Sequence, residues 1–153
     1  FGYQGSLWTV IAMQPLHMAD DLALVEQTLG PRGAWSYAWR AVLAGGAALA
    51  CGSDCPVASP NPFLGIHAAV TRQRADGSPP GGWYAQQRLS VAEAVAAYTA
   101  GPAQITGQWA RQGSLSPGKL ADLIVLDRDI FAIPPSEIPG TQVVMTVAAG
   151  ETR

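Results

Sequence analysis

The chain has 153 residues, the usual size of one domain with its own core. Its net charge is −2 and its nine Lys and Arg residues form no basic run, which excludes a nucleic-acid-binding surface. Charged residues make up only 13% of the chain, against about 25% in an average domain. Because a free-standing domain needs more polar surface, we interpret the chain as part of a larger protein that covers its apolar surface.

Compartment and membrane association can be read from the same composition. No apolar stretch approaches the roughly 18 residues of a membrane span, and no signal-peptide pattern opens the chain, so no membrane association is expected. Cys51 and Cys55 provide no disulfide framework, which favours a reducing compartment, and we expect a cytoplasmic protein. Two cysteines at this spacing could also hold a metal, but the chain has no second pair.

The first candidate ligand follows the first predicted strand. An apolar run over residues 6–13 predicts this strand, and Pro15 ends it. His17 comes directly afterwards, before a helix predicted from about Asp20 to Leu29. A lone histidine is usually structural, but this one stands between a strand and a helix.

A second helix is predicted before the next strand, ending at Gly45-Gly46. Its apolar face repeats at helical spacing through Trp35, Trp39, Val42 and Leu43. Arg40 falls off this face. It is either an ion-paired surface side chain or an anchor for a substrate.

The second candidate ligand is Asp54. The run from Ala47 to Cys51 is short, apolar and bounded by glycines, which is typical of a buried strand in a parallel sheet. Asp54 lies just past its carboxyl end, where α/β folds collect ligands and catalytic groups, although it could simply cap a turn. His17 occupies the same kind of position. Imidazole and carboxylate suit zinc, but a catalytic zinc needs about three protein ligands.

A third helix is predicted from Pro62, with Asn61 as its cap. Phe63, Ile66 and Val70 face the core. His67 lies beside them at helical spacing, so it is either a packing histidine or a ligand of a substrate or metal.

A long loop is predicted over residues 75–87, which are rich in glycine and proline. Loops of this length are usually functional or mobile. Trp83 and Tyr84 would either close over a site or pin the loop down.

The last part of the chain combines one more helix with strands. Ser90 and Glu93 form a capping box that opens this helix, and Gly101-Pro102 is predicted to end it. Strands are predicted over residues 121–126 and 143–148. The turn that follows predicts a hairpin.

Five motifs stand in order along the chain: Met13-Gln14-Pro15-Leu16-His17, Trp39-Arg40, Gly52-Ser53-Asp54-Cys55-Pro56-Val57, Gly65-Ile66-His67-Ala68-Ala69-Val70-Thr71-Arg72 and Ser114-Leu115-Ser116-Pro117-Gly118-Lys119-Leu120-Ala121-Asp122-Leu123. Together they resemble the C-terminal part of the metal-dependent amidohydrolases. Within that superfamily, the branch of cyclic-amide, formamide and N-acyl hydrolases is the most similar. The resemblance covers nearly the whole chain.

The resemblance implies an α/β fold with a metal-dependent hydrolase site. Residues 1–112 would be the C-terminal portion of a (β/α)8 TIM-type barrel, and residues 113–153 strands of a small composite β-sandwich. His17 would bind a divalent metal, zinc, with one or two ions in the full-length enzyme. Asp54 would bind metal and act as general base, passing a proton from the metal-bound water to the leaving nitrogen. Arg40 and His67 are the candidates for binding a small amide-type substrate.

Two departures from the family pattern qualify this expectation. Cys55 stands where this branch usually has an aromatic residue. The other family ligands belong upstream of Phe1, and because a full barrel takes about 250 residues, we expect the chain alone to be inactive. Its expected partner is the missing N-terminal part of the barrel, and the whole protein could form a homo-oligomer.

Two other functions remain open. A non-catalytic remnant or interaction module would keep the fold without the chemistry. Nucleophilic catalysis by a cysteine with a histidine lacks an evident orienting group.

Overall fold

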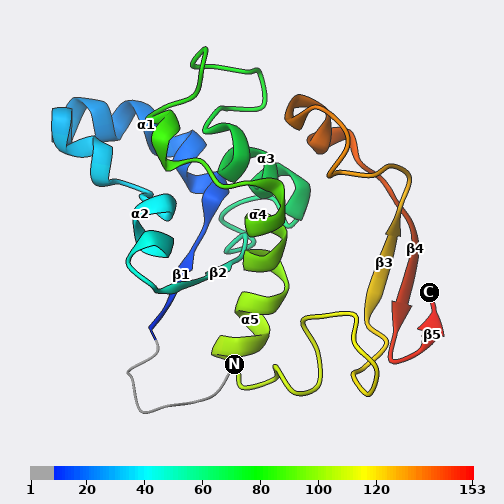
Figure 1. Ribbon diagram of the computed structural model, residues 1–153. Helices are drawn as coiled ribbons and strands as arrows, with labels where there is room; N and C mark the ends of the chain where they lie inside the picture. The colour runs from blue at the N-terminus through cyan, green and yellow to red at the C-terminus, as the bar shows by residue number, and fades with distance from the viewer. Residues whose placement is uncertain (1–8) are drawn as a thin grey trace.

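The computed structural model describes residues 9–153 as a mixed α/β structure with two small sheets (Figure 1). The α-helices are α1 (Pro15–Leu29), α2 (Trp39–Ala44), α3 (Pro62–Thr71), α4 (Val91–Tyr98) and α5 (Ala100–Ile105). Short 3-10 helices are η1 (Gly30–Trp35), η2 (Ala85–Gln87) and η3 (Pro135–Gly140). No helix in this part of the chain is long and apolar enough to cross a membrane.

The first sheet pairs β1 (Val10–Met13) with β2 (Ala48–Cys51) in parallel. A parallel pair needs a long crossover, which α1, η1 and α2 provide. Gly52 N–H donates to Met13 C=O at 3.2 Å, so both strands end at the same level. Both predicted strands are confirmed, although residues 6–8 of the first lie outside the described residues.

Helix α1 begins earlier than predicted, at Pro15 instead of Asp20. Proline has a helical φ and lacks an N–H that the first turn would leave unpaired, so it starts this helix as well as ending the strand. His17 therefore lies in the first turn of α1 and not in a loop before it.

The predicted start of the second helix at Trp35 is wrong. The segment from Gly30 to Trp35 forms the 3-10 helix η1, and the left-handed φ of +52° at Tyr37 separates it from α2. Trp35 is 75% exposed, whereas Trp39 at the start of α2 is completely buried.

The caps predicted for α3 and α4 are confirmed. Asn61 accepts from Phe63 N–H at 3.0 Å, and Ser90 and Glu93 form the reciprocal capping box. The predicted helix end at Gly101-Pro102 is wrong, because both residues lie in the first turn of α5. A Cβ at Gly101 would lie 1.9 Å from Leu49 O, so glycine lets α5 pack directly on β2.

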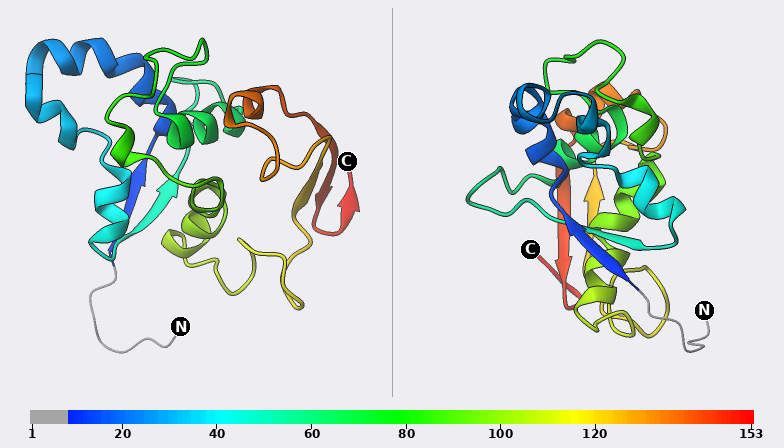
Figure 2. Two further views of the ribbon diagram at one scale, coloured as in Figure 1. Left: turned by 45° about the horizontal axis from the view of Figure 1, so that its top comes forward. Right: turned by 90° about the vertical axis from the view of Figure 1, so that its left-hand side faces the viewer.

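The second sheet has the antiparallel order β3-β4-β5. Its strands are β3 (Leu123–Leu126), β4 (Val143–Ala148) and β5 (Glu151–Thr152). The predicted hairpin is confirmed, with Ala149 and Gly150 both at positive φ. In Figures 1 and 2, helices α4 and α5 lie between the two sheets.

Candidate metal and catalytic site

His17 and Asp54 follow two strand ends that are paired with each other. Met13 and Cys51 are partners in the parallel register, His17 comes four residues after Met13, and Asp54 three residues after Cys51. The structure thus brings both predicted ligands to the carboxyl edge of one sheet, as expected for an α/β site.

One ring nitrogen of His17, Nε2, is buried without a polar contact to the described residues. Leaving a buried polar atom unpaired is costly, and such an atom calls for a bound water or ion. A divalent metal would satisfy this nitrogen, so the residue fits the ion that its position predicts.

Asp54 is held in an unusual backbone conformation. Its φ is +57°, a left-handed value that is uncommon for residues other than glycine. The turn is closed by Val57 N–H, which donates to Asp54 C=O at 2.8 Å, and by Cys55 N–H, which donates to Ser53 Oγ at 3.3 Å. Asp54 is exposed, and its carboxylate accepts no hydrogen bond from the described residues. Aspartate enters the left-handed region more readily than most residues, so the turn accounts for the conformation.

The described residues supply too few ligands for a complete metal site. No group of three or more His, Cys, Asp or Glu residues that could hold a metal occurs among residues 9–153. His17 and Asp54 could therefore supply two ligands of a metal, fewer than the roughly three that a catalytic zinc requires.

The two cysteines differ in their environment, and Cys51 is poorly suited to act as a nucleophile. Both are free, and burial raises the pKa of Cys51 to about 12, so this thiol stays protonated at neutral pH. Cys55 is exposed.

His67 is a buried residue of α3. It is 4% exposed, and burial lowers its pKa, which favours the neutral imidazole. This is the environment of the packing alternative, and a role for His67 in substrate binding stays a prediction.

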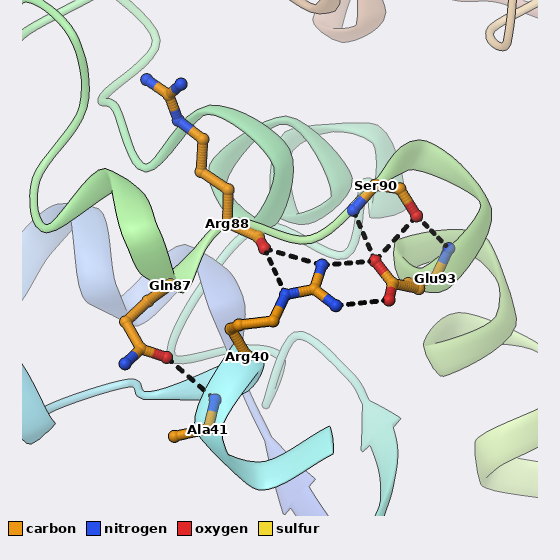
Figure 3. A network of polar contacts seen from close by, with 6 residues as sticks. All are labelled: Arg40, Ala41, Gln87, Arg88, Ser90 and Glu93. Carbon is orange, nitrogen blue, oxygen red and sulfur yellow. Dashed lines mark hydrogen bonds and ion pairs between the residues drawn. The ribbon is translucent and has the colours of Figure 1, made fainter. Parts of the chain in front are cut away.

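Arg40 forms an ion pair with Glu93 (Figure 3). Its two terminal nitrogens donate to the two carboxylate oxygens, each at 2.6 Å, and its Nε donates to Arg88 O at 3.2 Å. The hydrogen bond from Arg40 is the main cause that lowers the pKa of Glu93 to about 2. These contacts join α2 to α4, so the guanidinium has a structural partner, and its role in substrate binding stays a prediction.

The loop between α3 and α4 is pinned down by its aromatic residues. Trp83 is 5% exposed and donates from Nε1 to Glu26 Oε1 at 3.0 Å, while Tyr84 packs edge-on against it. Arg74 Nε donates to Ala19 O at 3.1 Å, two residues after His17. Figures 1 and 2 show this loop at the end of the molecule to which β1 and β2 run.

The burial of Arg72, which lies next to this loop, was not predicted from the sequence. Arg72 is completely buried, although an arginine after a helix normally reaches solvent. Its only sequence signal was its place at the end of the fourth motif, which says nothing about burial.

Comparisons with known proteins identify the family. The model of the Amidohydrolase family matches residues 5–153. The protein LONG AFTER FAR-RED 3 of Arabidopsis thaliana is 40% identical over 127 residues, covering 80% of this chain and 21% of that protein. N-substituted formamide deformylase of Arthrobacter pascens is 32% identical over 114 residues, covering 74% and 20%.

A solved structure has the same fold over most of the chain. It is the crystal structure of an uncharacterized metal-dependent hydrolase from Pyrococcus horikoshii, with a TM-score of 0.69 and 29% identity, covering 81% of this chain and 25% of that one. The chain thus spans a fifth to a quarter of the length of these relatives. Because the family model matches almost its whole length, the chain belongs to the Amidohydrolase family.

Proposed function

We propose that this chain is the C-terminal part of a metal-dependent hydrolase that cleaves an amide or other C–N bond. Residues 1–112 would contribute the last strands and helices of a (β/α)8 barrel, and residues 113–153 part of a β-sandwich. The parallel β1–β2 pair with its helical crossover supports the barrel. The observation that carries the proposal is the buried Nε2 of His17, which has no partner in the described part of the chain and lies at the same sheet edge as Asp54.

In this proposal His17 and Asp54 hold a divalent ion, zinc in the simplest case, together with ligands from outside the chain. The ion would supply Lewis-acid polarisation of the scissile carbonyl and a more acidic water. Asp54 takes a proton from the attacking water and delivers it to the nitrogen of the leaving group, so the amide is released as a neutral amine and an acid. Its exposed carboxylate accepts no hydrogen bond from residues 9–153 that would compete with this transfer.

We propose a small amide as the substrate. The support for this substrate class is one relative, which is named an N-substituted formamide deformylase.

The test uses the complete protein. Asp54→Asn keeps the size of the side chain but cannot accept the proton, so turnover of an N-substituted formamide should fall by a factor of about 100 to 10,000. His17→Gln should lower the bound metal, measured by elemental analysis after dialysis.

A matched control is Asp129→Asn, which changes an exposed carboxylate in the C-terminal part of the chain. An asparagine there can still accept the hydrogen bond from Phe131 N–H. It should leave both turnover and metal content unchanged. Near-normal turnover in Asp54→Asn would rule out the role of this residue. Absence of both turnover and bound metal in the unaltered protein would favour a non-catalytic module of the same fold.

A further inference from the structure

Arg72 occupies the centre of the contacts between α3 and the segments around it. It follows α3 with a left-handed φ of +60° and is completely buried. Its guanidinium carbon lies 4.6 Å from the centroid of the Trp39 ring and 5.1 Å from that of Trp83. Two aromatic faces therefore stabilise a charge that forms no ion pair with any residue in the described range.

The guanidinium joins two distant backbone segments. Its Nε donates to Trp83 O at 2.8 Å and its Nη1 to Tyr37 O at 2.5 Å. The planar fork of arginine suits this task, because it presents donors in fixed directions, whereas lysine has a single ammonium group.

Both of these residues in turn hold helix α1. Tyr37 donates from its hydroxyl to Asp21 Oδ2 at 2.5 Å, and Trp83 donates from Nε1 to Glu26 Oε1 at 3.0 Å. A third contact, from Arg74 Nε to Ala19 O, binds the same helix beside its first turn. Three polar contacts thus fix α1 along its length, and two of them depend on segments that Arg72 holds.

We propose that Arg72 is a positioning residue for the metal site: by holding Tyr37 and Trp83, it fixes α1 and thereby orients the imidazole of His17 toward the ion. This inference rests on the proposed function, because it takes His17 as a ligand.

The experiment compares two conservative variants of the complete protein, Arg72→Lys and Arg88→Lys. Arg88 also binds backbone carbonyls nearby, at Thr71 O in the last turn of α3 and at Gly81 O in the loop, but it donates no hydrogen bond to α1, Tyr37 or Trp83. Metal affinity is measured by competition of zinc with a coloured chelator, and kcat and KM are measured separately on an N-substituted formamide.

Arg72→Lys should weaken zinc binding by a factor of about 10, the lower end of what changes next to metal ligands produce. It should lower kcat with little change in KM, whereas Arg88→Lys should leave zinc affinity unchanged. Equal zinc affinity in Arg72→Lys and the unaltered protein, or equal losses in both variants, would overturn the inference.

A double-mutant cycle separates positioning from general loss of structure. If Arg72 acts through His17, adding Arg72→Lys to His17→Gln should weaken zinc binding no further. A full additional tenfold loss would overturn the inference. Zinc binding that is insensitive to His17→Gln would overturn the proposed function instead.

Glu26→Gln provides a milder variant in case Arg72→Lys fails to fold. It keeps an acceptor for Trp83 but removes the charge, at an exposed position. It should also weaken zinc binding, but only by about two- to threefold, because a single exposed polar contact contributes little. Unchanged affinity in Glu26→Gln together with an unfolded Arg72→Lys variant would count against the inference.

Discussion

Similar apolar side chains are buried in one region of the molecule and exposed in another. The first region is the helical part, which contains β1 and β2, and the second is the C-terminal sheet. In the helical part, side chains such as Met18 and Trp39 are completely buried against α3, α4 and β2. In the sheet, Ile124, Val144 and Met145 are 47%, 61% and 43% exposed. The same apolar composition thus makes a core in one region and a surface in the other.

The difference lies in what packs opposite each element. Helix α3 is covered on several sides by α1, α4 and η3, and Ile138 of η3 is completely buried. The sheet β3-β4-β5 borders a groove of about 1010 Å³, whose lining includes Phe63 and Ile66 of α3 and Phe131. An exposed apolar sheet of this kind is typical of a surface that another layer covers.

Trp39→Ala should have the largest effect on stability, and it tests whether the helical part has a buried core. Removing a completely buried tryptophan leaves a cavity and takes away one ring that stacks on Arg72. The free energy of unfolding, measured with urea, should fall by about 3–5 kcal/mol. Trp35→Ala is the matched control, because that side chain is 75% exposed and should change stability by less than about 0.5 kcal/mol. Similar losses in the two variants would contradict the buried core described for α2.

Glu93→Gln should have an intermediate effect that depends on pH. The hydrogen bond from Arg40 lowers the pKa of Glu93 to about 2, below its usual value near 4.5, so the ion pair stabilises the fold above pH 5. This stability is lost as the pH falls from about 5 to about 2. Because the two side chains are 41% and 33% exposed, solvent screening limits the contribution to about 1 kcal/mol.

The Gln variant keeps the helix cap, since glutamine also serves in a capping box. In urea titrations between pH 2 and 7, its free energy of unfolding should therefore fall less on acidification than that of the unaltered protein. Part of the acid dependence should remain, because the pKa values of Asp76 and Asp127 are also lowered by hydrogen bonds. Glu151→Gln removes an exposed carboxylate from the terminal hairpin and serves as control. A pH dependence that is the same in Glu93→Gln and the unaltered protein would show that this ion pair adds no stability.

Val144→Thr should have the smallest effect on stability, and it tests whether the C-terminal sheet is exposed. Threonine keeps the β-branched shape, and its hydroxyl would face solvent, so stability should change by less than about 0.5 kcal/mol. The matched control is Val70→Thr in α3, which is 9% exposed and should cost about 1–3 kcal/mol. A loss at Val144 as large as that at Val70 would mean that another layer covers the sheet in the whole protein.

Several elements were predictable because their signals lie within a few residues of one another. The capping box of Ser90 and Glu93, the cap at Asn61 and the hairpin at Ala149 each depend on local hydrogen bonds or backbone geometry. The placement of His17 and Asp54 at one sheet edge followed from two apolar runs and the rule that parallel strands end together.

Other features depended on packing between residues far apart in the chain. Trp35 and Trp39 carry the same side chain and fitted the same helical pattern, yet the turn at Tyr37 exposes one and the contact with Arg72 buries the other. Gly101 predicted a helix end by its type, but its closeness to Leu49 made it a packing site inside α5.

The local chemistry of the chain was therefore sufficient to indicate the caps, the strand ends and the two candidate ligands, because these features arise from neighbours in sequence. The buried Arg72 and the contacts that hold α1 required the folded molecule. They arise where segments around residues 21, 37, 72 and 83 meet, and only long-range packing brings such segments together.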